Sequence, residues 1–264
     1  MGHREIYPNP PLALSVVELR HTTTPALSEA DQAALKAALG ESFPLAKPAR
    51  RGMNLKVGPA GIAQEALLDP RFMARDTTAA ITYRTDAIVV ETTRYARRGS
   101  LRELLHQAVE ARQKIAPADG IERLGVRYIN EVRAPGIEGP ADWTRWITAP
   151  LASVAGLAPD STHPALSWQG MAVFGTPASG VVLRHGTLEG YAVDPAGDLR
   201  RKTPHPGPFY LIDLDSYWVP DQEKPPLGWE IIEERFNETA LAAYSLFEQL
   251  ITDEFRQEVL RRDQ

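Results

Sequence analysis

Alternating apolar and polar residues along the chain predict a protein rich in β-strands. The clearest case is Arg123–Val132, RLGVRYINEV, where Tyr128 and Asn130 share one face with aliphatic residues and Arg127 lies on the other. The other predicted strands are Leu12–His21, Met53–Val57, Thr77–Tyr83, Asp86–Ala96, Ser167–Phe174, Val181–Val193 and Phe209–Trp218. A strand needs only apolar residues on its buried face. The presence of Arg127, Tyr128 and Asn130 near the centre of Arg123–Val132 therefore requires a separate explanation.

Helical periodicity and capping residues predict two helices in the first part of the chain. Ser28 is followed three residues later by Asp31, which is typical of a capping box, and Gly40 marks the end of that helix. Ser100 is followed by Glu103 at the same spacing. We therefore expect Ser28 and Ser100 to be helix N-caps.

Two further helices are predicted in the second part. The first covers residues 141–157, where Pro150 either kinks the helix or begins a second short one capped by Thr148. The second is a long terminal helix, Trp229–Val259. The side chains expected to face inward on it are Phe236, Leu241, Tyr244, Phe247, Ile251 and Phe255.

The order of these elements predicts an α+β fold with two βαβββα-like halves, residues 1–118 and 119–264. Their mostly antiparallel sheets are expected to pack together or run continuously, with helices on one side, leaving a cleft between the halves. The two halves share negligible sequence identity, so a single continuous α+β domain is the alternative. The topology is loosely similar to the tandem modules of GyrI-like ligand-binding domains, a likeness that implies a fold and not a function.

Four segments together resemble a sporadically distributed bacterial family of uncharacterised proteins. These segments are YPNPPLALSVVELR near the start, RLGVRYINEV, LIDLDSYW, and LFEQLITDEFRQEV near the end. Members open with a Tyr-x-Asn-Pro-Pro segment and end with an Ile-Thr-containing helix. The resemblance spans almost the whole chain, but it implies no established activity and supplies no catalytic residues.

Composition narrows the class of protein. The chain has 264 residues, a net charge of −5 and no cysteine. The acidic balance argues against a nucleic-acid partner, and the lack of cysteine excludes disulfides and thiolate chemistry. No signal-peptide core and no run of membrane-spanning length is present, so we expect a bacterial, cytoplasmic protein with no membrane partner.

Most enzyme motifs are absent from the sequence. It contains no phosphate-binding glycine loop, no dinucleotide fingerprint and no Gly-x-Ser-x-Gly elbow, and its histidines have no metal-ligand spacing. We therefore expect neither a metal nor a cofactor. The arginine-rich stretch TRYARR, residues 93–98, is interpreted as a solvated strand end; a phosphate contact there runs against the acidic balance.

Asp213 and Asp215 form the sharpest candidate for chemistry. At positions i and i+2 of a strand their carboxylates point to one side, about 7 Å apart. Two such carboxylates could hold a divalent cation or divide acid and base roles, but no supporting ligands are visible. Pairing with arginine is the favoured interpretation, and Arg127 is the expected partner because an unpaired guanidinium is costly to bury. Tyr128 and Asn130 then remain for a ligand on the opposite face.

These residues allow us to predict the general class of function but not the ligand. The ligand-binding candidates are Arg127, Tyr128, Asn130, Asp213 and Asp215. The preferred hypothesis is a non-catalytic accessory protein that binds a small molecule or a protein partner in the cleft between the halves, with a homodimer as one arrangement. The alternative is a hydrolase or lyase that uses the two aspartates with the arginine, and a third option is a structural subunit of a complex.

Overall fold

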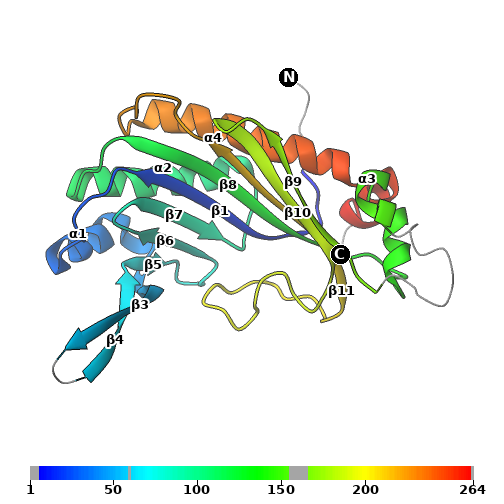
Figure 1. Ribbon diagram of the computed structural model, residues 1–264, viewed down its shortest axis with the longest axis horizontal. Coiled ribbons are helices and arrows are strands. Elements are labelled where there is room, and N and C mark those ends of the chain that lie inside the picture. Colours follow the sequence, from blue (N-terminus) through cyan, green and yellow to red (C-terminus); the bar gives the residue numbers. More distant parts are fainter. Residues whose placement is uncertain (1–5, 59–60, 155–165, 263–264) are drawn as a thin grey trace.

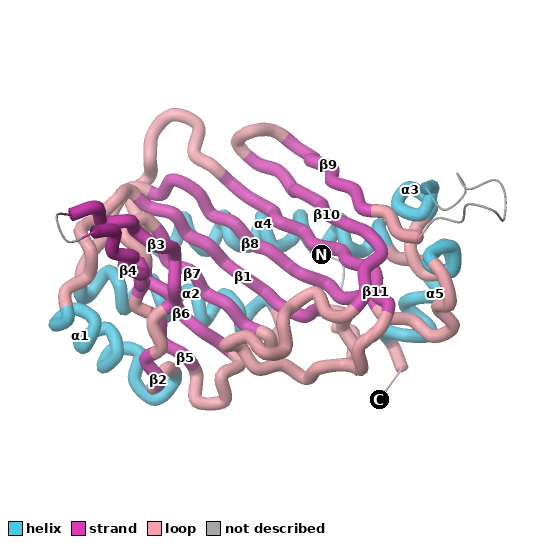
Figure 2. The backbone as a smooth tube through the Cα atoms, turned by 60° about the horizontal axis from the view of Figure 1, so that its bottom comes forward, coloured by secondary structure: helices cyan, strands magenta, loops and turns pink. Residues whose placement is uncertain are grey.

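The computed structural model describes residues 6–58, 61–154 and 166–262. It shows a mixed α+β fold, in which helices pack against one face of a large antiparallel sheet (Figure 1). Figure 2 shows the opposite face of the sheet turned toward the viewer, with the helices behind it. The predicted α+β class and the antiparallel sheet are confirmed.

The strands and helices lie close to the predicted segments, with differences at several ends. The strands of the large sheet are β1 (Leu12–His21), β2 (Leu45–Ala46), β5 (Arg71–Met73), β6 (Ala79–Tyr83), β7 (Ala87–Thr92), β8 (Ile121–Val132), β9 (Gln169–Gly175), β10 (Ser179–Glu189) and β11 (Pro208–Trp218). A separate hairpin projects from one end and consists of β3 (Ala49–Gly58) and β4 (Gly61–Asp69). The α-helices are α1 (Glu29–Leu39), α2 (Arg98–Ile115), α3 (Ala149–Ala152), α4 (Trp229–Leu250) and α5 (Asp253–Phe255).

The strand order places β1 and β8 at the centre of the sheet. The full order is β2-β5-β6-β7-β1-β8-β11-β10-β9, and β1 pairs with β8 so that Val17 lies opposite Val126. Going outward, β7, β6 and β5 follow β1, and β11, β10 and β9 follow β8. On each side, the first strand of the series lies at the centre and the later strands follow outward in reverse order along the chain. The strand order is thus the same on both sides of the centre, although the division into two halves near residue 118 stays a prediction.

The alternation in β8 decides which side chains enter the core. Leu124 and Val126 are buried beneath the helices, as is Val132 at the end of the strand. Full burial of such side chains stabilises the fold by about 1.5–3 kcal/mol each. Arg123 and Arg127 lie on the other face, which we call the open face, where they meet carboxylates of the neighbouring strands.

The long loop between β10 and β11 packs against the open face. Its Leu199 is buried in a small cluster with Met73. Its Arg201 donates through Nη2 to Oε2 of Glu131, a buried carboxylate on β8, over 2.7 Å. The loop therefore shields charged side chains of this face from solvent.

One of the two predicted helix caps is confirmed. Ser28 precedes α1, and its side chain accepts a hydrogen bond from the backbone of Asp31, whose carboxylate accepts one from Ser28 in return. The prediction for Ser100 is wrong, because α2 begins two residues earlier at Arg98. The carbonyl of Arg97 already accepts hydrogen bonds from the backbone N–H groups of Ser100 and Leu101, so Ser100 lies inside the first turn.

The predicted single terminal helix is also wrong. Helix α4 ends at Leu250, because Ile251 has extended backbone and forms an antiparallel bridge with Ile147. Phe247 and Ile251 are buried as expected, but Leu241 is exposed. The helix thus ends where a distant segment offers backbone pairing, a signal that is absent from its own periodicity.

The helix predicted over residues 141–157 is replaced by two shorter pieces in its described part, and residues 155–157 lie outside the described residues. A 3₁₀ segment, Pro140–Arg145, precedes α3, and α3 begins directly after Thr148. The alternative in which Pro150 lies at the start of a second short helix is therefore confirmed, although the Thr148 side chain makes no capping hydrogen bond. Proline is favoured there because the first turn of a helix needs no N–H from it.

Candidate functional site

The five predicted site residues separate onto the two faces of the sheet. Arg127, Asp213 and Asp215 lie on the open face, where β8 and β11 run side by side. Tyr128 and Asn130 point to the helix-covered face and line a cavity. The structure therefore does not bring all five residues into a single site.

The predicted contact between Arg127 and Asp213 is confirmed, and it is bidentate. Arg127 Nε lies 2.7 Å from Oδ1 of Asp213 and Nη2 lies 2.6 Å from Oδ2. These hydrogen bonds raise the pKa of the Arg127 guanidinium. The Asp213 side chain is 3% exposed, and Nη1 of Arg184 approaches it to 3.6 Å.

Asp215 has a different partner. Arg123 donates through Nη2 to its Oδ1 over 3.0 Å. Each aspartate is thus neutralised by its own arginine, so the two carboxylates do not converge on a common position. No cluster of three potential metal ligands occurs among the described residues. Structural pairing of the aspartates with arginine, the favoured interpretation of the sequence, is what the geometry supports.

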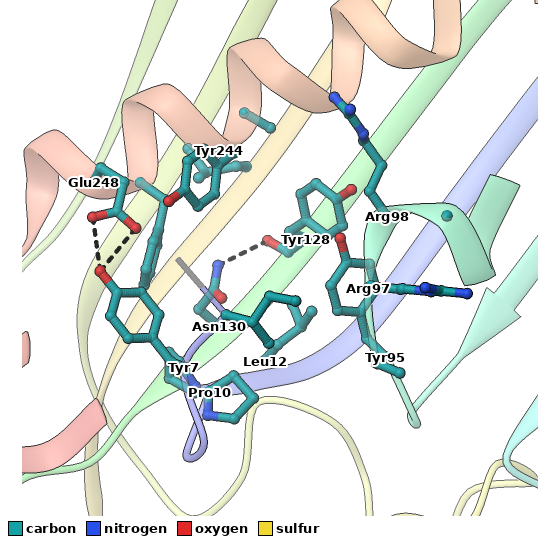
Figure 3. A pocket seen from close by; sticks show the side chains of 17 residues that line it. Tyr7, Pro10, Leu12, Tyr95, Arg97, Arg98, Tyr128, Asn130, Tyr244 and Glu248 are labelled. Carbon is teal, nitrogen blue, oxygen red and sulfur yellow. Dashed lines mark hydrogen bonds between the residues drawn. The ribbon is translucent and has the colours of Figure 1, made fainter. Parts of the chain in front are cut away.

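The cavity lies on the helix-covered side of β8, between the start of α2, the last turns of α4 and the segment that precedes β1 (Figure 3). Its volume is about 300 Å³, which is within the range of small-molecule sites. Most of its lining is apolar or aromatic. The aromatic side chains that line it are Tyr7, Tyr95, Tyr128, Tyr244 and Phe247.

The segment before β1 forms one wall and is held to the C-terminal part of the chain. The hydroxyl of Tyr7 donates to both carboxylate oxygens of Glu248 on α4, over 3.0 and 3.2 Å. Asn9 donates its backbone N–H to the carbonyl of Leu260 over 3.1 Å. The following Pro10 lines the cavity. Residues near both ends of the chain therefore close this wall together.

The floor of the cavity comes from β8. Asn130 is only 5% exposed, and its Nδ2 donates to the carbonyl of Ile212 on β11 over 2.9 Å. The rings of Tyr95 and Tyr128 meet edge to face, with centroids 5.6 Å apart. These contacts hold the amide of Asn130 and the two rings in place.

The rim next to Tyr95 is the beginning of α2. The N-cap is Arg97, which provides no side-chain capping bond, and the first turn contains no acidic residue. Arg98, the first residue of the helix, lines the cavity and is half-buried. This end of the cavity therefore combines a positive side chain with the positive end of a helix dipole.

The opposite end of the cavity holds its one carboxylate among the described lining residues. Glu248 accepts from Tyr7 and also from Nε of Arg256 over 3.1 Å, so its charge is already compensated. Acid–base catalysis by a carboxylate pair would need a second carboxylate nearby, which the described lining does not provide. The Glu248 carboxylate is also already engaged by Tyr7 and Arg256. The arrangement is suited to holding an apolar, flat molecule with a few polar anchors.

Several cavity residues were not among the sequence candidates, including Tyr7, Tyr95, Arg98, Tyr244 and Glu248. A signal for two of them did exist. Tyr7 belongs to the opening Tyr-x-Asn-Pro-Pro segment and Glu248 to the closing LFEQLITDEF segment, and both carried the family resemblance. The hydrogen bonds between Tyr7 and Glu248 show that these terminal motifs meet at the cavity.

No family model and no curated protein matches the chain. Within the described part of the chain, no helix combines the length and the apolar character needed to cross a membrane.

Proposed function

We propose that this protein is a non-catalytic accessory protein that binds a small molecule in the cavity between α2 and α4. The observation that carries the proposal is the cavity itself: about 300 Å³, lined by five aromatic side chains, with Asn130 and Arg98 as polar anchors. Small-molecule sites combine an apolar lining with a few fixed polar groups in this way.

The alternative of a hydrolase or lyase has less support. It required Asp213 and Asp215 to act together with Arg127, but the two carboxylates are neutralised by different arginines. They also lie on the open face, on the other side of the sheet from the cavity. Glu248 is the one carboxylate among the described residues that line the cavity, whereas acid–base catalysis by such a pair would need two that converge.

A cavity-filling variant tests the proposal. Ala243 lines the cavity from α4, whereas its neighbour Ala242 is exposed and does not. We expect the fluorescent probe 1-anilinonaphthalene-8-sulfonate to bind the purified protein at one saturable site. Ala243→Phe should abolish this binding, and the matched control Ala242→Phe should leave it unchanged.

Native mass spectrometry of the freshly purified protein provides the second measurement. A co-purified small molecule should accompany the wild type and Ala242→Phe but not Ala243→Phe. Unchanged probe binding in a folded Ala243→Phe variant, judged by its circular dichroism and urea midpoint, would show that the cavity is not the binding site.

The position of the cavity also relates to the proposed duplication. We propose that residues 1–118 and 119–264 are two α+β halves similar to tandem GyrI-like modules. The recurrence of strand order on both sides of β1 and β8 supports this, as does the equivalent place of α2 and α4 at the end of each half. The cavity between α2 and α4 then lies where the two halves meet, as expected for a binding cleft.

A further inference from the structure

The two ends of the cavity differ in charge, and this difference restricts the ligand. Arg97 and Arg98 lie at one end with Tyr95 and Tyr128, and Asn130 lies further along toward Tyr7 and Glu248 (Figure 3). A molecule that fills the cavity therefore meets a cationic rim at one end and an amide at its centre.

No residue in the described part of the chain compensates the positive charge of Arg98. Among the described residues, Arg98 has no ion pair and no side-chain hydrogen bond, whereas Arg102, one turn further along α2, pairs with Glu233 over 2.6 Å. The backbone N–H groups of Ser100 and Leu101 donate to the carbonyl of Arg97, whereas those of Arg98 and Gly99 have no acceptor among the described residues, and both of these residues line the same end of the cavity. An anionic group placed there would be stabilised by both features.

A second, independent feature is a hydrogen-bond acceptor in the cavity wall, the side-chain carbonyl of Asn130. Asn130 is 5% exposed, and its Nδ2 is occupied by the carbonyl of Ile212. Its carbonyl oxygen Oδ1 accepts no hydrogen bond from any described residue, although the side chain lines the cavity. Because Oδ1 retains accessible surface and has no donor among the described residues, a ligand that supplies an N–H or O–H group can form a hydrogen bond there and gain affinity.

The space between these anchors is bounded by rings. Tyr95 and Tyr128 form one side, and Phe247 and Tyr244 come from α4 on the other. Asn130 is two residues from Tyr128 on β8, a step of about 7 Å. A bicyclic ring system with a short acidic side chain has suitable length and flatness, and offset or edge-on ring contacts would hold it.

We propose that the ligand is an aromatic carboxylate that also carries a hydrogen-bond donor on its ring. This inference rests on the proposed function and names its ligand class. The carboxylate binds Arg98 and the first N–H groups of α2, the ring lies among the aromatic side chains, and the ring N–H donates to Oδ1 of Asn130. A carboxylate suits this end because its two oxygens match the planar fork of one guanidinium.

Indole compounds provide matched probes, to be measured by isothermal titration calorimetry. Indole-3-acetate should bind at least about tenfold more tightly than neutral indole, and cationic tryptamine should bind more weakly than either. 1-Methylindole-3-acetate, which lacks the ring donor, should lose about tenfold relative to indole-3-acetate. This probe tests Asn130 without changing a buried residue.

Protein variants test the anionic end. Arg98→Gln should weaken indole-3-acetate about tenfold and leave the binding of indole unchanged, while the control Arg94→Gln should affect neither. Arg94 is exposed and does not line the cavity. Equal affinities of indole and indole-3-acetate, or tighter binding of indoxyl phosphate than of indole-3-acetate, would overturn the carboxylate assignment.

The outcomes separate this inference from the proposed function. If none of the indole probes binds while 1-anilinonaphthalene-8-sulfonate still binds in a manner sensitive to Ala243→Phe, the ligand class is wrong and the cavity remains a binding site. If neither kind of probe depends on the cavity, both proposals are wrong.

Discussion

Replacing Arg127 by methionine should destabilise the protein, because it would leave a charge buried on the open face. Asp213 is 3% exposed and receives two short hydrogen bonds from Arg127. Methionine keeps the apolar stem of the side chain but removes both bonds. The loss of one partner of a buried ion pair costs about 3–5 kcal/mol.

Two features of the structure reduce that cost. Arg127 is 43% exposed, so solvent already screens part of its interaction with Asp213. Arg184 lies 3.6 Å from the same carboxylate and can take over part of the compensation. We therefore expect Arg127→Met to lower the free energy of unfolding by about 2–3 kcal/mol. For a chain of this size, this corresponds to a fall in Tm of about 4–12 °C.

Urea denaturation followed by circular dichroism measures this change, and a double variant separates charge from packing. Adding Asp213→Asn to Arg127→Met removes the uncompensated charge and should recover much of the lost stability. Arg20→Met is the matched control, because Arg20 pairs with Glu18 at an exposed position and should change stability by less than about 0.5 kcal/mol. The reasoning is refuted if Arg127→Met is as mild as Arg20→Met, or if the double variant is no more stable than the single one.

The other predictions concern a cap, a buried histidine and the N-terminal wall. Ser28→Ala should lower the free energy of unfolding measured in urea by about 1 kcal/mol, whereas Ser100→Ala should leave it almost unchanged, because Ser28 caps a helix and Ser100 does not. Equal losses in the two variants would contradict the assigned helix starts. Burial lowers the pKa of His21 below its ordinary value, so the unfolded state binds its proton more readily. The stability that follows from keeping His21 neutral is complete above about pH 6.5, and it is lost progressively as the pH falls from there through the lower pKa of the folded state. His21→Gln should therefore flatten the dependence of the urea midpoint on pH between about 5 and 7.5, and an unchanged slope would refute this. Tyr7→Phe removes the hydrogen bonds to Glu248, so limited proteolysis should cleave the N-terminal segment faster than in the wild type, and an equal rate would show that these bonds do not hold the wall.

The sequence by itself determined the local structure and the facing of side chains. The alternation in Arg123–Val132 depends only on the two-residue repeat of a strand, so it predicted both the buried aliphatic face and the position of Arg127 opposite Tyr128 and Asn130. The pairing of Arg127 with an aspartate of β11 followed from the cost of burying an unpaired guanidinium. The cap at Ser28 was predictable because its two partners are three residues apart.

Tertiary structure decided the features that depend on distant segments. Helix α4 ends where Ile251 pairs with Ile147, and no periodic pattern within the helix carries that information. The cavity combines Tyr7, Asn130 and Glu248, which are more than 100 residues apart from one another along the chain. Hydrophobic periodicity reports the conformation of each segment separately, whereas a cavity exists only once the sheet order and the packing of α2 and α4 have brought those segments together.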